Sequence, residues 1–379
     1  MRDGWTETTL DDLVLSGVVL LGRGNVISKK DMEVDPGPYP VYSSAQNNDG
    51  RIGLYNKFMF DEELITWSVD GGGHIFYRPH HKFSVTNIGG YLRILDNSKF
   101  LYPFLAAVLQ KLHGQHVFDW QNKAHPSVIR KLYNNIPLAS INEQKRIVDV
   151  VSSVDSYIDA LQKQAESART AFLAVCEDIF SAEENLKPLH EVATVIMGQS
   201  PEGNTCNTDG IGTPLLNGPT EFTKITVGPP RQWTSRETKL SRSGDILFCV
   251  RGATAGRINI GNYQSVIGRG LAAIRCKTHE DTDLVRYALT VGLRQLLPAA
   301  GGTIFPNISR AQLRNFEVSW PSEIRRVELS ALLKSIEGVF LRAEQAVVKA
   351  KKLRSGLLSD LLSGEHEIPM SYDKFLKAA

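Results

Sequence analysis

Residues 147–179 have the sequence IVDVVSSVDSYIDALQKQAESARTAFLAVCEDI, and this stretch determines the predicted fold. Apolar or small residues recur in it in alternating steps of four and three, with no Gly or Pro between them: Ile147, Val151, Val154, Ile158, Leu161, Ala165, Ala168, Phe172, Val175 and Ile179. That spacing is the a/d pattern of a coiled-coil helix. We therefore predict one helix over residues 141–182, roughly 60 Å long at about 1.5 Å per residue.

A second stretch near the end of the chain has the same stepping. Its a/d positions are Leu329, Leu332, Ile336, Val339, Ala343, Ala346, Ala350, Leu353 and Leu357, and Leu333, Phe340 and Val347 widen its apolar face. It predicts a helix over residues 321–364, with a tail at 365–379. Neither helix can bury its seam alone, and a globular region separates the two in sequence. An antiparallel pair is therefore expected, while pairing of each seam with another chain stays an alternative.

The regions before the two helices also repeat, at a spacing of about 180 residues. Residues 64–69 align with 246–251, 90–94 with 270–274, 125–129 with 305–309, and 143–147 with 323–327. Any one of these matches is weak. Four matches in the same order at a nearly constant offset indicate an internal duplication.

Each helix follows a region of mixed character, residues 1–140 and 183–320. Both regions contain short apolar runs, β-branched segments and turns rich in Gly, Pro and Asn. These features are typical of mixed α/β domains with curled sheets. The predicted fold class is therefore α+β: two mixed α/β domains, separated by two long helices that form an antiparallel coiled coil with a pseudo-twofold duplication.

Composition limits the class of protein. The chain has 379 residues, of which 42% are hydrophobic and 22% are charged, as in an ordinary globular protein. Its four cysteines include no Cys-x-x-Cys pair, and its first residues do not form a signal peptide. We therefore expect a cytoplasmic protein with reduced thiols and no membrane partner.

The sequence lacks the motifs of the common enzyme classes. It has no Gly-x-x-x-x-Gly-Lys-Ser/Thr phosphate loop, no complete dinucleotide fingerprint, no zinc-ligand spacing and no Gly-x-Ser-x-Gly elbow. We therefore predict no catalytic residues, no metal ligands and no cofactor in this chain. A nuclease or methyltransferase that acts alone is a rival hypothesis without support from any motif.

Charge is unevenly distributed behind the net value of +2. Residues 1–140 carry 14 basic and 14 acidic residues, 141–182 carry 4 and 7, 183–320 carry 15 and 12, and 321–379 carry 10 and 8. Residues 231–277 contain nine basic residues, seven of them Arg, and only two acidic ones. Because the guanidinium fork suits phosphate and guanine edges, this stretch favours nucleic acid over the alternative of a solvated basic face.

Two loops in the first domain, at residues 42–51 and 119–125, are rich in amides and hydroxyls. Asn and Gln recognise adenine in the major groove, although such loops are also common turns. The predicted DNA-binding residues are Ser43, Ser44, Gln46, Asn47, Arg51, Gln121, Asn122 and Lys123 in the first domain, and Asn217, Thr220, Arg251, Thr254, Arg257, Arg269, Thr303 and Asn307 in the second.

Several short motifs carry a resemblance to a known family. Residues 136–147 contain IPL and INEQKRI at the start of the first helix, and residues 244–256 contain GDIL followed by RGATAG. Residues 302–308 read GTIFPNI before the second helix, and residues 39–43 read YPVYS. With the duplication and the helix placement, these motifs resemble the specificity (S) subunit of type I restriction–modification systems over nearly the full length.

The resemblance implies a non-catalytic subunit. Its two target-recognition domains would each recognise one half of a bipartite, asymmetric site in double-stranded DNA, and its helices would set the distance between the halves. The resemblance also implies two methyltransferase (modification) subunits that bind S-adenosylmethionine, and restriction subunits that use ATP. The alternative is a scaffold or antirestriction decoy that binds methyltransferase subunits without specific DNA recognition.

This sequence departs from the family pattern at both helix starts. Ile324 stands where the family has Gln, and Ala139-Ser140 replace a pair of prolines. These departures predict that the two halves meet their partners differently.

Overall fold

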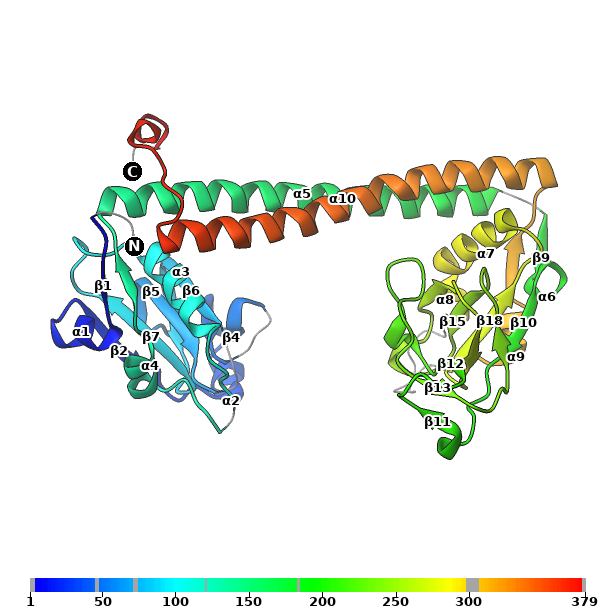
Figure 1. The fold of residues 1–379 in the computed structure, drawn as a ribbon, viewed down its shortest axis with the longest axis horizontal. Helices are drawn as coiled ribbons and strands as arrows, with labels where there is room; N and C mark the ends of the chain where they lie inside the picture. The colour runs from blue at the N-terminus through cyan, green and yellow to red at the C-terminus, as the bar shows by residue number, and fades with distance from the viewer. Residues whose placement is uncertain are drawn as a thin grey trace. The chain divides into compact units, whose positions relative to one another are not determined.

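The computed structural model describes residues 4–44, 48–70, 74–119, 121–182, 185–297 and 307–376. The chain forms two compact units: unit 1 comprises Met1–Ala160 and Val348–Ala379, and unit 2 comprises Leu161–Val347. The division cuts both long helices, α5 (Ile141–Ala182) and α10 (Glu323–Ser363). Each unit therefore contains a mixed α/β domain together with the adjoining parts of both helices (Figure 1).

The two helices run antiparallel, as predicted. In unit 1, Arg354 of α10 forms two hydrogen bonds with Asp155 of α5, with N–O distances of 2.6 and 2.8 Å. In unit 2, the rings of Phe340 of α10 and Phe172 of α5 lie 5.2 Å apart. Residue numbers thus rise along one helix as they fall along the other.

The predicted seam is confirmed for α5 but is partly wrong for α10. Ile158 and Phe172 of α5 are buried, whereas Leu332 and Val339 of α10 are 48% and 51% exposed. Leu333 of α10 is fully buried in their place. The cause is that α10 also packs against α7 (His279–Val291), whose Leu284 and Tyr287 share a core cluster with Leu333 and Phe340. This contact turns the buried face of α10 away from the strict a/d positions.

Unit 1 contains a curled sheet in which described strands follow the order β2-β7-β5-β6-β3-β4. Its elements are β1 (Thr6–Thr8), α1 (Leu10–Leu15), β2 (Val19–Arg23), α2 (Lys29–Val34), β3 (Tyr39–Tyr42), β4 (Arg51–Tyr55), β5 (Phe60–Ser68), β6 (Ile75–Val85), β7 (Gly89–Ile94), α3 (Tyr102–His113), α4 (Pro126–Leu132) and β8 (Ile136–Leu138). Both neighbours of β5 run antiparallel to it. The central strand is buried from Leu64 to Ser68, on both faces, as expected for a strand covered on each side.

Unit 2 contains two small sheets, with described strands in the orders β10-β18-β15-β16 and β11-β13-β12-β17-β14. Its elements are β9 (Leu186–Pro188), α6 (Leu189–Val192), β10 (Thr194–Met197), β11 (Cys206–Asn207), β12 (Thr213–Leu216), β13 (Trp233–Thr234), β14 (Leu240–Ser241), β15 (Ile246–Cys249), β16 (Ile258–Ile260), β17 (Ser265–Ile267), β18 (Leu271–Arg275), α7, α8 (Leu293–Leu296), α9 (Arg310–Arg314) and β19 (Glu317–Ser319). Successive side chains of β15 point alternately into two hydrophobic core clusters, one on each face of the strand.

The duplication is visible in how the strands pair. In unit 1 β1 pairs with β8 directly before α5, and in unit 2 β9 pairs with β19 directly before α10. The β5–β7 pair followed by α3 likewise corresponds to the β15–β18 pair followed by α7. The two domains therefore share one plan despite different side chains.

The helix starts differ between the copies, as their sequences predict. Gln144 is fully buried and forms three hydrogen bonds, to the Leu101 N–H and to the carbonyls of Lys99 and Ala139. Ile324, at the corresponding position, is 77% exposed. The hydrogen bonds of Gln144 thus join the start of α5 to its domain. In the second copy, isoleucine at the corresponding position cannot form them.

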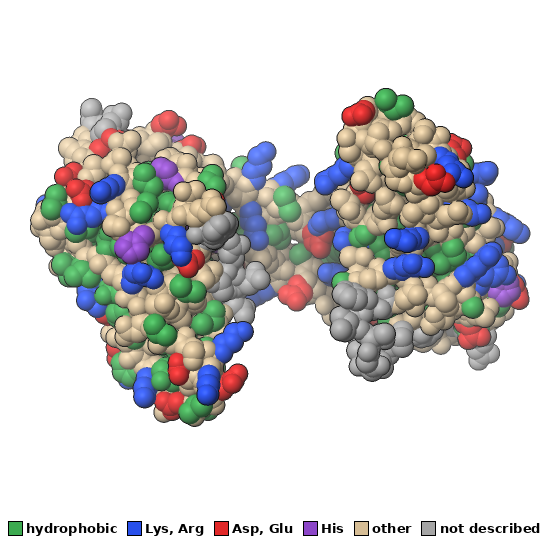
Figure 2. Space-filling view, turned by 90° about the horizontal axis from the view of Figure 1, so that it is seen from below, with side chains coloured by type: hydrophobic (Ala, Val, Ile, Leu, Met, Phe, Trp, Pro, Cys, Tyr) green, Lys and Arg blue, Asp and Glu red, His purple; other side chains and the backbone are tan. Residues whose placement is uncertain are grey.

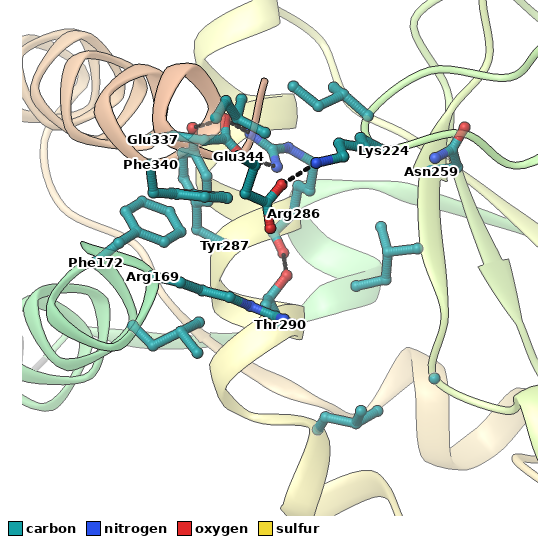
Figure 3. Close-up of a pocket in the computed structure, with 16 residues that line it drawn as sticks. Arg169, Phe172, Lys224, Asn259, Arg286, Tyr287, Thr290, Glu337, Phe340 and Glu344 are labelled. Carbon is teal, nitrogen blue, oxygen red and sulfur yellow. Dashed lines mark hydrogen bonds and ion pairs between the residues drawn. The ribbon is translucent and has the colours of Figure 1, made fainter. Parts of the chain in front are cut away.

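In unit 2, paired charges hold the domain against α10 instead. The Arg286 guanidinium of α7 binds the Glu337 carboxylate through two hydrogen bonds of 2.7 Å, and the Tyr287 hydroxyl donates a third to Glu337, also at 2.7 Å (Figure 3). About three turns earlier in α10, Arg326 pairs with Asp281 of α7 at 2.7 Å. These contacts lie along the α7–α10 face that also buries Leu333.

The segment after α10 folds back onto α5 in unit 1. Met370–Phe375 forms a 3-10 helix, from which the Tyr372 hydroxyl donates to Asp149 at 2.7 Å and Asp373 binds Arg146. The hydrogen bond from Arg146 holds the pKa of Asp373 below its usual value of 3.8. The predicted tail is therefore anchored at its described part. No helix within the described ranges is long and apolar enough to cross a membrane.

Candidate nucleic-acid interface

The first predicted loop of unit 1 joins β3 to β4, and its described ends are fixed by hydrogen bonds. The Ser43 N–H donates to the Gly50 carbonyl at 2.8 Å, and the Thr86 hydroxyl donates to the Ser43 hydroxyl at 2.7 Å. Arg51 lies opposite Tyr42 across the β3–β4 pair and is exposed. Ser43 and Arg51 thus lie side by side at the base of the loop, and Ser44 is half-buried beside them.

The second predicted loop of unit 1 is folded around Asp119. The Asp119 carboxylate accepts hydrogen bonds from the N–H groups of Gln121 and Asn122, at 2.8 and 2.6 Å. Both amide side chains are exposed, and Lys123 pairs with Asp70 at 3.1 Å. The turn is therefore held by hydrogen bonds between backbone N–H groups and the Asp119 carboxylate. The side-chain amides of Gln121 and Asn122 take no part in these bonds and are available to a ligand.

Long-range hydrogen bonds bring both loops to one rim of the sheet. The Thr86 N–H donates to the Tyr42 carbonyl at the base of the first loop, and the Val69 N–H donates to the Ile88 carbonyl. The Ala124 N–H, at the end of the second loop, donates to the Val69 carbonyl. The turn between β6 and β7 thus links the two loops, which are about 75 residues apart in the sequence.

In unit 2, the predicted residues converge at the end of β15. Arg251 follows this strand and forms an isolated antiparallel bridge with Asn307, and both residues are exposed. The next turn carries Thr254, whose carbonyl accepts from the Arg257 N–H at 3.1 Å. The Val250 N–H donates to the Gly270 carbonyl at 2.9 Å, which places the Arg269 turn beside Arg251.

Asn217 lies against the same turn. Its side-chain amide donates to Gln232 Oε1 at 3.1 Å, and a Cβ on Gly268 would lie only 2.2 Å from its Oδ1 atom. Glycine at position 268 therefore allows Asn217 to approach the backbone before Arg269. Thr220 is exposed in the short turn that follows Asn217.

Some arginines of residues 231–277 form ion pairs, and others are exposed without one. Arg275 binds Asp245, which is 2% exposed, through hydrogen bonds of 2.9 and 2.7 Å, and Arg236 pairs with Glu202. Arg251, Arg257 and Arg269 are exposed and form no ion pair with another described residue. Figure 2 shows that Lys and Arg side chains are more frequent than acidic ones on the visible face of unit 2. The exposed group is thus the part of the basic stretch that can bind an anionic ligand.

Sequence reasoning missed residues that only the pairing of distant segments brings to these rims. Arg23 donates to the Asn87 carbonyl beside the turn between β6 and β7, and the Ser200 hydroxyl accepts from the Arg269 N–H at 3.2 Å. Arg23 and Ser200 lie outside the amide-rich and arginine-rich stretches, so no local feature of the sequence marked these two residues. Predicted residues Gln46, Asn47 and Thr303 lie outside the described residues.

Metal-ligand clusters and cysteine thiols are the reactive groups to consider in the described residues. No cluster of His, Cys, Asp or Glu within them could hold a metal ion. Burial raises the pKa of the Cys249 thiol to about 11 and that of the Cys276 thiol to about 12, so both stay protonated at neutral pH. The arrangement provides hydrogen-bond donors, acceptors and cations at two rims, which is suited to binding.

Known proteins resemble this chain in sequence and in fold. The family described as type I restriction modification DNA specificity domain matches residues 2–168. A relative from Methanocaldococcus jannaschii, named putative type I restriction enzyme MjaX specificity subunit, is 28% identical over 251 residues. That match covers 61% of this chain and 59% of the archaeal protein, less than two thirds of its length.

Two solved structures share the fold. One, from work on complex assembly and conformational transition of the type I R-M system, has a TM-score of 0.61 at 20% identity and covers 96% of this chain and 98% of its own. The type I S subunit from M. genitalium has a TM-score of 0.53 at 16% identity and covers 95% and 97%. The match to the specificity-domain family thus covers the first domain and part of α5, and the two solved structures share the fold over nearly the whole chain.

Proposed function

We propose that this chain is the non-catalytic DNA-specificity subunit of a type I restriction–modification complex, and that it works in the cytoplasm. The domain of each unit would recognise one half of a bipartite, asymmetric site in double-stranded DNA. The observation that carries the proposal is that each domain gathers polar or cationic side chains at one rim, all exposed except the half-buried Ser43: Ser43, Arg51, Gln121 and Asn122 in unit 1, and Asn217, Arg251, Arg269 and Asn307 in unit 2. Because these two sets differ, the two half-sites would differ as well.

Chemistry is assigned to partner subunits in this proposal. Two methyltransferase subunits would bind S-adenosylmethionine and methylate adenine, and restriction subunits would supply ATP-dependent cleavage. The naming of relatives as specificity subunits, and the origin of one structural neighbour in work on complex assembly, support this division of labour.

An exposed apolar stripe on α10 supports docking of a methyltransferase subunit. Ile324, Leu332 and Val339 are 77%, 48% and 51% exposed and lie eight and seven residues apart, about two helical turns in each case. They therefore share one face of α10 within unit 2. An apolar face of this kind on a helix is a common protein-binding surface.

Leu332→Asp is expected to weaken binding of the methyltransferase subunit about ten-fold or more, because it places a carboxylate in an apolar contact. The free energy of unfolding of the chain should change little, since Leu332 is already half exposed. Affinity measured by calorimetry with the purified partner checks this. Leu15→Asp, at a 71% exposed leucine of α1, is the matched control; equal binding by both variants would remove α10 as the docking face.

DNA recognition itself is tested by selecting duplexes from a random library with the assembled complex. We expect enrichment of two short, different sequence blocks at a constant separation. A complex that assembles but enriches no sequence would instead support the alternative, a scaffold or antirestriction decoy. Modification of DNA by the chain without any partner would contradict the assignment of chemistry to other subunits.

A further inference from the structure

A buried arginine lies directly beneath the first loop of unit 1. Arg78, in β6, is only 5% exposed, so it cannot reach a ligand in solvent. Its guanidinium carbon lies 3.7 Å from the centre of the Tyr42 ring and 4.5 Å from that of the Phe76 ring. Burial lowers the pKa of Arg78 to about 10, which still leaves it charged at neutral pH.

The Arg78 side chain joins the sheet to the end of the loop. Its Nε–H donates to the Thr66 hydroxyl of β5 at 2.9 Å, and its Nη2 donates to the Asp49 carbonyl at 2.6 Å. Thr66 is itself 2% exposed, so this end of the connection is fixed within the core. The other end determines where the Asp49 peptide lies.

Asp49 has an unusual backbone conformation that such a contact can hold. Its φ of 51° and ψ of 32° are in the left-handed region, which few residues other than Gly, Asn and Asp adopt. The turn that Asp49 makes leads through Gly50 to Arg51, and the Gly50 carbonyl accepts from the Ser43 N–H. The position of Asp49 therefore fixes both Ser43 and Arg51.

The energetic cost of burying Arg78 also indicates that this residue does more than fill space in the core. A buried charge is costly unless it is well paired, and an apolar side chain of similar volume would fill the space between Tyr42 and Phe76 at lower cost. Only a guanidinium can stack on both rings while it donates to two separate acceptors. Lysine would supply the charge without this geometry.

We propose that Arg78 is a positioning residue that determines sequence discrimination at one half-site by fixing Ser43 and Arg51, without itself contacting DNA. This inference rests on the proposed function of the chain. Arg78 would thus influence specificity although, being buried, it is not part of any DNA contact surface.

The test measures methylation by the assembled complex on duplexes with a single base-pair change in either half-site. For Arg78→Lys and Arg78→Met, the ratio of matched to mismatched rates should fall about ten-fold at the half-site that unit 1 recognises, the loss expected for one base contact. The ratio at the other half-site should keep the wild-type value. Arg93→Lys, at an arginine of the same domain that binds Glu62, is the matched control and should leave both ratios unchanged.

Two results would overturn this inference while leaving the proposed function intact. Wild-type ratios at both half-sites in both variants would show that Arg78 does not affect discrimination. An equal fall at both half-sites would show a structural role alone. Arg78→Lys, which keeps the charge, provides the answer if Arg78→Met does not fold. A wild-type complex without discrimination at either half-site would overturn the proposed function and this inference with it.

Discussion

Glu337→Ala is expected to lower the free energy of unfolding of unit 2 by about 3–5 kcal/mol. The Glu337 carboxylate accepts two hydrogen bonds from Arg286 and one from Tyr287, and it is 8% exposed (Figure 3). Its removal would leave a largely buried guanidinium and a buried hydroxyl without their partner. Denaturant unfolding, followed by circular dichroism, measures the loss.

Another glutamate of α10, which lines the pocket drawn in Figure 3 together with Glu337, supplies a matched control. Glu344, two turns further along α10, pairs with Lys224, whose side chain is 55% exposed. Glu344→Ala should therefore cost less than about 1 kcal/mol. Replacing both partners, with Arg286→Met and Glu337→Leu, should restore most of the stability, because no unpaired charge remains. A loss for Glu337→Ala as small as that for Glu344→Ala would contradict this explanation.

Arg251→Ala and Arg269→Ala are each expected to weaken methylation at the half-site that unit 2 recognises by about 1–3 kcal/mol if they contact a base edge. That range corresponds to a fall of roughly 5- to 150-fold. Arg251 follows β15 and Arg269 lies in the neighbouring turn before β18, and both are exposed and without an ion pair among the described residues. Methylation rates of the assembled complex, on duplexes altered in one half-site at a time, measure the effect.

Arg236→Ala is the control, because it removes the same charge from an arginine that already pairs with Glu202. If Arg251 or Arg269 contacts phosphate instead, binding should weaken alike for all sequences, and the salt slope should fall by about one. Unchanged binding and methylation in both variants would remove the assignment of the β15 rim as an interface.

The sequence was sufficient for the helices because their signal is local. The four-and-three spacing from Ile147 to Ile179 predicts α5, and the predicted positions Ile147, Ile158, Ala165 and Phe172 are buried. It was insufficient for the buried face of α10, because Leu332 and Leu333 are both leucines and only the packing of α7 selects between them. A heptad pattern describes the packing of two helices, so it does not predict how a third helix from another part of the chain changes which residues are buried.

The candidate interface shows the same limit. The loops at 42–51 and 119–125 and the exposed Arg251 could be proposed from composition, since turn residues and arginines are visible in the sequence. The rim that joins them could not, because hydrogen bonds from Thr86 and Val69 create it between distant segments. Arg78 was missed for the opposite reason: it is buried, and nothing in its immediate sequence marks it as the support of a loop.

Charge also has a different meaning once it is placed in the structure. The net charge of +2 gives no indication of nucleic-acid binding. Arg275 and Arg286 are used in buried pairs, whereas Arg251, Arg257 and Arg269 remain exposed. A small set of placed cations supports recognition more than bulk attraction, which the partner subunits would supply.

The central claim, that two different domains each recognise half of one DNA site, is tested most directly by mapping methylated adenines. Cells that express the chain together with its methyltransferase partner should contain one bipartite, asymmetric motif with a fixed gap, and cells that express the partner alone should lack it. Arg251→Ala should relax that motif in one half only. A continuous motif, or the same methylation with and without the chain, would contradict the account.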